Sequence, residues 1–233
     1  MGEDKFILQK VFYFAAWAFL WLYATVVLRK SIHRHGDLPA GSKIFVSNHP
    51  SATDPFMIHI ISRKQMNVLI TAKAFAVPIF GWYLRKVREI PVPLKEGSTA
   101  LNQAADYIQK GRSVAIFIEG KISPPDGSFL QPRTGAARLA LASGAPVIPI
   151  GIYLRRDLCK NIRSKIDGAE AEASWYLRGP YAITIGKPMQ FEGDVEDRQY
   201  VRNVTEKIMD QIRLLAEESK RRIQRLKPVV TSG

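Results

Sequence analysis

The chain has 233 residues, 46% of them hydrophobic, and a formal net charge of +13. This length suits one sizeable domain with an appended element, and the hydrophobic fraction is sufficient for a packed core. The charge favours a polyanionic partner: nucleic acid, an anionic membrane surface or a phosphorylated substrate. The single cysteine, Cys159, excludes an intramolecular disulfide and suits a domain that faces a reducing cytosol.

An uncharged segment without Gly or Pro runs from Val11 to Leu28. As a helix it would extend about 27 Å, close to the roughly 30 Å apolar core of a bilayer. The long apolar run and the lack of a clear Ala-x-Ala site argue against a cleaved signal peptide. Aromatic residues on every side argue against a surface helix with a polar face. We therefore predict a membrane-anchoring helix, either spanning or embedded in one leaflet.

The larger basic cluster follows this segment, which predicts that the rest of the chain faces the cytoplasm. A membrane explains the net charge more simply than nucleic acid does, because no nucleic-acid-binding motif is found. We predict two parts: residues 1–35, the anchoring helix and its basic flank, and residues 36–233, one domain of catalytic size. The residues expected to contact the membrane are Trp17, Trp21, Arg29 and Lys30.

After a polar linker at 33–42, short apolar runs alternate with helical patterns. In the linker, His33 and His35 are predicted to be solvated, with metal binding as the alternative. The predicted strands are 43–48, 67–71, 113–119, 146–154 and 181–186. The predicted helices are 55–62, 97–111 with Ser98 as a possible cap, 135–144, and 195–226. This alternation predicts an α/β fold with a mixed, largely parallel sheet flanked by helices. Residues 155–178 give no clear pattern.

The stretch VSNHPSATDP places His49 and Asp54 between a predicted strand and a predicted helix. Asp54 followed by Pro55 is typical of a helix start, with Asp54 as the N-cap. An imidazole that donates one N–H to a carboxylate can act as a general base on an alcohol, and no enzyme nucleophile is required if that alcohol belongs to the substrate. From these residues alone, a surface histidine near a capping aspartate remains an equal alternative.

Four sequence blocks, in order, resemble those of the glycerolipid acyltransferases, the family of glycerol-3-phosphate and 1-acylglycerol-3-phosphate (lysophosphatidate) acyltransferases. The blocks are NHPSATDP, VPIFGWYLRKVREIPV (77–92), FIEGKIS (117–123) and APVIPIGI (145–152). The resemblance covers residues 43–152. It implies a glycerol-3-phosphate acyltransferase-like fold in which His49 is the general base and Asp54 orients it.

The resemblance also implies a membrane-associated O-acyltransferase of phospholipid biosynthesis. It would move a fatty acyl group from acyl-CoA or acyl carrier protein to a glycerolipid hydroxyl, with lysophosphatidate as the favoured acceptor. Membrane lipids and the acyl donor are the expected partners, without nucleic acid, and neither a metal, a cofactor nor a covalent enzyme intermediate is implied. The residues expected to bind substrate are Glu119, Gly120, Lys121, Ser123, Arg88 and Arg133.

Two positions depart from the family pattern, because Leu94 and Ile122 stand where the family has the arginines that hold the acceptor phosphate. An arginine binds a phosphate through two parallel hydrogen bonds, which leucine and isoleucine cannot form. Charge could come instead from Lys121, Arg88, Lys95 or Arg133. Two alternatives therefore remain open: the same chemistry on a lysophospholipid or glycolipid acceptor, and a noncatalytic lipid-binding or scaffold protein.

Overall fold

The computed structural model describes residues 2–94, 96–166 and 169–225. Its main sheet has the strand order β1-β9-β6-β2-β5-β3-β4. The strands are β1 (Ser31–Arg34), β2 (Ile44–Ser47), β3 (Met66–Thr71), β4 (Ile90–Val92), β5 (Ser113–Phe117), β6 (Val147–Leu154) and β9 (Tyr181–Ile185). Neighbours from β6 to β4 are parallel, whereas β9 runs antiparallel to β6 and parallel to β1. The predicted mixed, largely parallel α/β sheet is confirmed.

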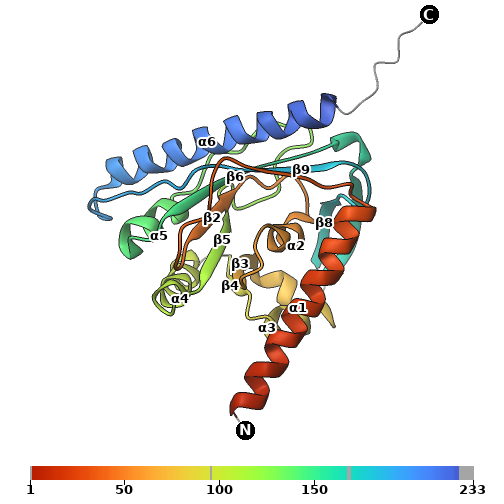
Figure 1. Ribbon diagram of the computed structural model, residues 1–233, viewed down its shortest axis with the longest axis horizontal. Coiled ribbons are helices and arrows are strands. Elements are labelled where there is room, and N and C mark those ends of the chain that lie inside the picture. Colours follow the sequence, from red (N-terminus) through yellow and green to blue (C-terminus); the bar gives the residue numbers. More distant parts are fainter. Residues whose placement is uncertain (1, 95, 167–168, 226–233) are drawn as a thin grey trace, which may run out of the picture.

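Helices cover both faces of this sheet (Figure 1). Successive side chains of a strand point to opposite faces, so Ile44 and Val46 pack on one side of β2 and Phe45 on the other. The first side is covered by α4 (Gly97–Gln109), α5 (Gly135–Ser143) and α6 (Arg198–Arg225). The second is covered by α1 (Gly2–Val26), α2 (Asp54–Met57), the 3₁₀ helix η1 (Ile58–Ile61) and α3 (Phe80–Lys86).

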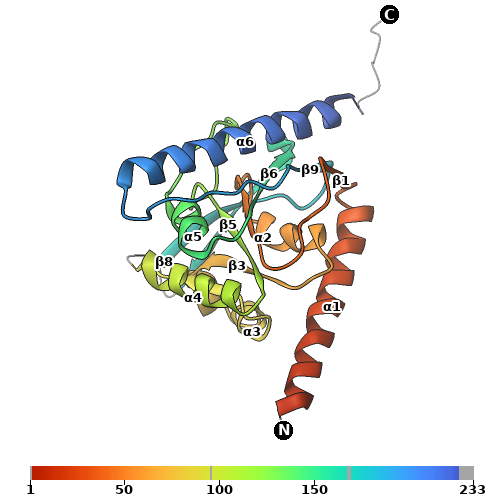
Figure 2. The ribbon, with the colours of Figure 1, turned by 60° about the vertical axis from the view of Figure 1, so that its left-hand side comes forward.

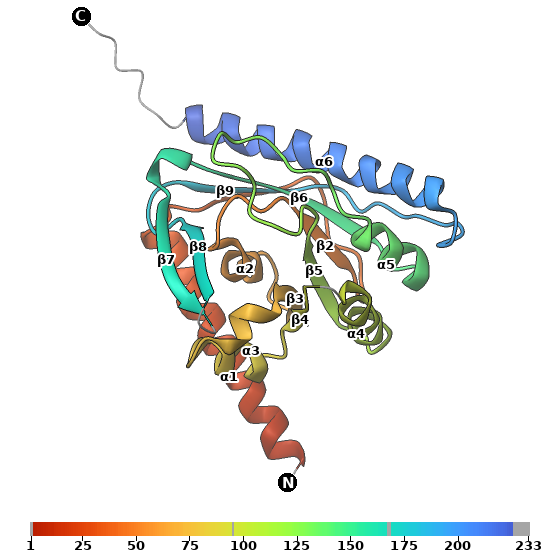
Figure 3. The same cartoon turned by 180° about the vertical axis from the view of Figure 1, so that it is seen from behind.

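The long helix α6 lies along β6 and β9 (Figure 3). At the crossing, a Cβ added to Gly151 would lie 2.0 Å from the backbone nitrogen of Ala216, so only glycine allows this approach. The Ser219 hydroxyl on α6 donates to the Gly151 carbonyl at 2.9 Å. The contact fixes α6 against the sheet.

Several elements differ from those predicted. Residues 155–178 contain the 3₁₀ helix η3 (Arg156–Leu158) and an antiparallel pair, β7 (Lys160–Ile166) and β8 (Ala169–Trp175). The predicted linker contributes to the edge strand β1, and α3, β4 and the 3₁₀ helix η2 (Ala72–Ala76) were not anticipated. The proposed Ser98 cap is wrong, because α4 begins at Gly97 and the capping position is Glu96.

The predicted N-terminal helix is present as α1, which ends at Val26 rather than at Leu28. Its N-terminus points away from the sheet and its C-terminal end lies beside β1 (Figure 2). Tyr13, Ala24 and Leu28 are buried. In the part of the chain that the structure describes, no helix has the length and apolar character needed to cross a membrane, so the spanning form of the predicted anchor is unsupported.

Candidate active site

The His49 loop, residues 48–53, connects the carboxyl end of β2 to α2. Its first residue, Asn48, is buried and bridges to the neighbouring strand β6. The Asn48 side-chain amide donates to the Ile152 carbonyl at 2.9 Å, and the Ile152 N–H donates to the Asn48 side-chain oxygen at 2.8 Å. This paired contact fixes the direction in which the chain leaves the sheet. Carboxyl ends of parallel strands are the usual place for sites in α/β folds.

Asp54 is completely buried, and its carboxylate accepts four hydrogen bonds. The Ser51 N–H and His49 Nδ1 reach Oδ2 at 2.6 and 3.0 Å, and the Ser51 and Tyr181 hydroxyls reach Oδ1 at 2.8 Å each. The prediction of Asp54 as the N-cap of the helix is wrong: Thr53 holds that position and Asp54 is the first helical residue. The carboxylate instead holds the loop that precedes the helix.

His49 is therefore held from two directions. Its Nδ1 lies 3.0 Å from Asp54 Oδ2, and its ring stacks on Phe117 with centroids 4.2 Å apart and planes 22° apart. An ionised carboxylate only accepts hydrogen bonds, so a neutral His49 carries its proton on Nδ1. Among the described residues, none hydrogen-bonds to Nε2. The His49 side chain is 14% exposed, so the ring is not fully enclosed.

Glu119 also holds the His49 loop, through hydrogen bonds of its carboxylate. Its Oε1 accepts the backbone N–H of His49 at 3.1 Å and the Ser123 hydroxyl at 2.7 Å, and its Oε2 accepts the Leu130 N–H at 2.7 Å. The Ser123 N–H donates to the His49 carbonyl at 2.8 Å. Glu119 and Ser123 are both buried. Glu119 and Ser123, two of the six predicted substrate-binding residues, thus lie at the site, where they contact the backbone of His49.

Residues 155–178, which sequence analysis left unassigned, include two residues that bond to the His49 loop. The Thr53 hydroxyl donates to the Tyr176 carbonyl, just after β8, at 2.9 Å, and accepts the Tyr176 N–H at 3.0 Å. Arg156 Nη1, from η3, donates to the Pro50 carbonyl at 2.6 Å. The loop is therefore bonded to chain more than 100 residues away.

The remaining predicted substrate-binding residues fall into two groups. Gly120, Lys121 and Arg133 are exposed beside the site: a Cβ added to Gly120 would meet the Arg133 side chain at 2.6 Å. Arg88 is elsewhere. Its carbonyl accepts from Asn67 at the amino end of β3, whereas His49 follows the carboxyl end of β2. The structure does not bring Arg88 to His49, and Lys95 lies outside the described residues.

Tyr181 is the positioning residue that sequence analysis missed. Burial, with the Asp54 carboxylate as a second cause, raises the pKa of the Tyr181 hydroxyl well above its usual value, so it remains a donor to Asp54. It begins β9 and lies 127 residues from Asp54 in the chain. Its apolar strand context, YAITIG, gives no signal of this role.

A second histidine–carboxylate pair, His59 and Glu89, lies next to α1. His59 Nε2 is 2.9 Å from Glu89 Oε1, and the Tyr13 hydroxyl is 3.4 Å from His59 Nδ1. Glu89 also accepts a hydrogen bond from the Val68 N–H. Both ring nitrogens of His59 therefore face partners within the chain.

The four predicted membrane-contacting residues lie at the C-terminal half of α1 or just after it. Trp21 and Arg29 are exposed, and Lys30 Nζ lies 3.6 Å from the Trp21 ring centroid. Trp17 is half-buried and lines, with Trp21, a cavity of about 370 Å³ between α1, β1 and η1.

Comparisons with known proteins place the chain in a family. The sequence profile of the acyltransferase family matches residues 29–153, and the chain belongs to that family. A 1-acyl-sn-glycerol-3-phosphate acyltransferase of Pseudomonas aeruginosa is 28% identical over 151 residues, which are 63% of this chain and 56% of that protein. The chain thus matches little more than half the length of that relative.

A solved structure has the same fold. The crystal structure of the 1-acyl-sn-glycerophosphate (LPA) acyltransferase PlsC from Thermotoga maritima superposes with a TM-score of 0.56 at 18% identity. The match covers 91% of this chain and 98% of that one. At this identity the likeness concerns the fold, a mixed and mostly parallel sheet flanked by helices.

Proposed function

We propose that this protein is an O-acyltransferase that moves a fatty acyl group from acyl-CoA or acyl carrier protein to a glycerolipid hydroxyl. The observation that carries the proposal is His49, whose Nδ1 faces a fully hydrogen-bonded, buried carboxylate while its Nε2 has no partner among the described residues. Family membership and the names of both relatives support the same activity.

In the proposed reaction, His49 Nε2 takes the proton of the acceptor hydroxyl as its oxygen attacks the thioester carbonyl. Asp54 keeps the Nδ1 proton in place and stabilises the imidazolium that forms. The tetrahedral intermediate collapses with cleavage of the carbon–sulfur bond, and the imidazolium returns its proton to the departing thiolate. An ester and a free thiol result, and no covalent bond to the enzyme forms.

Lysophosphatidate is the proposed acceptor, as the names of both relatives suggest. Lys121 and Arg133 are exposed cations beside the site that could hold its phosphate. Leu94, which stands where the family has one of the two phosphate-binding arginines, is 87% exposed. The same departures, Leu94 and Ile122, favour a second candidate: the same transfer to a lysophospholipid or glycolipid without a terminal phosphate.

We further propose that α1 binds a membrane from one side, with the domain facing the cytoplasm. Large apolar side chains of α1 and the turn after it remain exposed. They are Val11, Phe12, Phe14, Phe19, Trp21, Leu22, Val26 and Val27. Exposed Trp82 of α3 contacts Phe12 edge to face, with centroids 6.0 Å apart, and extends this surface. An exposed apolar surface of this extent marks a membrane or protein contact.

The activity test supplies purified protein with palmitoyl-CoA and, one at a time, lysophosphatidate, lysophosphatidylcholine, lysophosphatidylethanolamine and a monoacyl glycolipid. Thiol release that depends on lysophosphatidate is the expected result. Release with another acceptor alone would support the second candidate. Inertness with every acceptor, also when acyl carrier protein replaces coenzyme A, would contradict the enzyme proposal and favour a lipid-binding scaffold.

The membrane test is flotation with vesicles of phosphatidylglycerol and phosphatidylethanolamine. Phe19→Ser with Leu22→Ser should reduce the bound fraction strongly, because both side chains are more than half exposed (68% and 58%). Thr25→Ser, an exposed position on the same helix, is the matched control and should bind as the original chain does. Unchanged flotation of the double variant would contradict this role of α1.

A further inference from the structure

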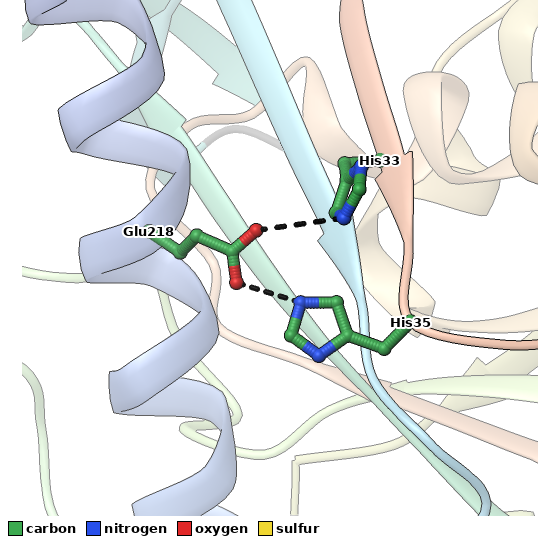
Figure 4. Close-up of side chains that lie close together, drawn as sticks. All are labelled: His33, His35 and Glu218. Atoms are coloured by element: carbon green, nitrogen blue, oxygen red, sulfur yellow. Dashed lines mark hydrogen bonds and ion pairs between the residues drawn. The ribbon is translucent and has the colours of Figure 1, made fainter.

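Three side chains of types that can bind a metal ion, His33, His35 and Glu218, lie close together away from the His49 loop. Two of them, His33 and His35, are alternate residues at the carboxyl end of β1, where the His35 N–H still bonds to the β9 residue Ile185. Alternate residues of an extended chain share one face, and here that face points to α6. Glu218 projects from α6 between the two rings (Figure 4).

The geometry suits one small ion. Glu218 Oε2 lies 2.7 Å from His35 Nε2, and Glu218 Oε1 lies 3.9 Å from His33 Nε2. One ligand atom from each residue fits within a separation of 4.8 Å. Tetrahedral Zn²⁺ with bonds of about 2.0–2.1 Å holds its ligand atoms roughly 3.3 Å apart. Closing the set requires only small side-chain rotations, which the exposed fractions of 53%, 35% and 35% permit.

We propose that His33, His35 and Glu218 form a binding site for a divalent transition-metal ion, with Zn²⁺ as the type ion. Two imidazoles and one carboxylate select Zn²⁺, Ni²⁺ or Cu²⁺ over Mg²⁺ and Ca²⁺, which prefer oxygen ligands. Water completes the fourth position. The ion joins the edge strand β1, which directly follows α1, to the C-terminal half of α6. Its role is structural, because it holds the end of the proposed membrane-binding segment to the domain.

Arg222 sets the orientation of the carboxylate. Its guanidinium Nη1 lies 3.2 Å from Glu218 Oε1 and donates at 2.7 Å to Thr184 Oγ1, while Nη2 donates at 2.9 Å to the Ile183 carbonyl. Since β9 anchors Arg222, Glu218 can keep Oε1 on the arginine and bind the ion through Oε2. A polar group that orients a ligating carboxylate in this way raises metal affinity. The positive charge of Arg222 acts in the opposite direction, so we expect a moderate affinity.

The test is calorimetric titration of the full, tag-free chain with Zn²⁺, and separately with Ni²⁺ and Mg²⁺. We expect one Zn²⁺ per chain with micromolar or tighter affinity, binding of Ni²⁺, and none of Mg²⁺. Glu218→Gln should weaken Zn²⁺ binding at least tenfold, and His33→Ala with His35→Ala at least a hundredfold. Glu217→Gln is the matched control: Glu217 pairs with Lys220 and Arg221 instead, so its loss should leave the affinity unchanged.

Two further measurements identify the site. His49→Ala should retain Zn²⁺ binding, because the catalytic imidazole is not a ligand of this ion. The midpoint of thermal unfolding should rise with Zn²⁺ for the original chain but not for the double histidine variant. Binding that survives in the double variant, or that is lost in His49→Ala, would overturn the proposal and leave His33, His35 and Glu218 as a hydrogen-bonded contact only.

Discussion

Two histidine–carboxylate pairs in the described part of the chain, His49–Asp54 and His59–Glu89, differ in whether the second ring nitrogen of the histidine has a partner. In the pair His49–Asp54, the carboxylate accepts four hydrogen bonds, and Nε2 of His49 has no partner in the described part of the chain. In the pair His59–Glu89, both ring nitrogens face partners, Glu89 and Tyr13. The distances are almost equal, 3.0 and 2.9 Å. Proximity of a carboxylate therefore does not distinguish the proposed base, His49, from a structural contact such as His59, whereas a ring nitrogen without a partner does.

Exchange of each histidine for glutamine should separate the two pairs most strongly. His49→Gln removes the proposed base and should lower kcat/KM by about 10³-fold, within the range for general-base catalysis, in a protein that still folds, because Asp54 keeps three of its four hydrogen bonds. His59→Gln should retain turnover per folded molecule but lower the free energy of unfolding by about 1–3 kcal/mol, because Glu89 loses a buried partner. Acceptor-dependent thiol release and thermal unfolding measure both. Similar losses of turnover in the two variants would remove the distinction.

The two carboxylates, Asp54 and Glu89, should also differ, because only the loss of Asp54 should slow turnover. Asp54→Asn no longer fixes the proton on Nδ1 of His49, and kcat should fall about 10²-fold. Glu89→Gln keeps an acceptor for the Val68 N–H and should leave kcat within about twofold of the original, since it touches no reacting group. Steady-state kinetics on both variants provide the check. An Asp54→Asn protein with full kcat would show that the carboxylate does not orient the base.

The tyrosines provide a finer comparison. Tyr181→Phe removes one donor from the Asp54 carboxylate, and a loss of about 1.4 kcal/mol of transition-state stabilisation would slow turnover about tenfold. Tyr13→Phe removes the long contact to His59 and should change stability only. A change in kcat without a change in KM is expected for Tyr181→Phe. If Tyr13→Phe reduces kcat as much, α1 contributes to the reaction and the account must change.

The smallest effect concerns alkaline pH at the second pair. Burial, and then the charge of Glu89, raises the pKa of Tyr83 to about 12. Its folded-state pKa exceeds the unfolded value, so the stabilisation is complete below pH 10 and is lost as pH rises from 10 to 12. The loss is up to about 3 kcal/mol in total, and about half of it occurs by pH 11. Tyr83→Phe should flatten this part of the curve in denaturant titrations from pH 9 to 11. An equally steep curve for the variant would assign the loss to other groups.

The sequence predicted the sheet because its strands are continuous apolar runs between helical patterns. It also indicated the His49–Asp54 pair, through the order of four sequence blocks. It did not predict Tyr181, Asn48 or Tyr176 as supports of the loop, because these contacts join positions more than 100 residues apart and leave no local pattern. The strands β7 and β8 were not predicted because their polar and charged sequences lack the apolar runs that mark the main sheet.

One predicted detail is wrong and another residue lies away from His49, each for a local reason. Asp54 followed by Pro55 is typical of a helix start, yet the Asp54 carboxylate bonds back to Ser51 and to Tyr181, and the preceding Thr53 holds the N-cap position. Arg88 lies within the second sequence block, but the short helix α3 returns the chain to the amino end of β3 before β4 begins. In both cases the sequence pattern singles out the residue, but its contacts depend on the path that the backbone takes in the folded protein.

The most direct measurement of the available nitrogen is a multiple-bond ¹⁵N–¹H correlation spectrum of the imidazoles, recorded at a pH where both rings are neutral. Each ring nitrogen that faces an ionised carboxylate carries the proton. We expect His49 as the Nδ1–H tautomer with unprotonated Nε2, and His59 as the Nε2–H tautomer. An Nε2–H tautomer at His49 would contradict the assignment of this histidine as the base.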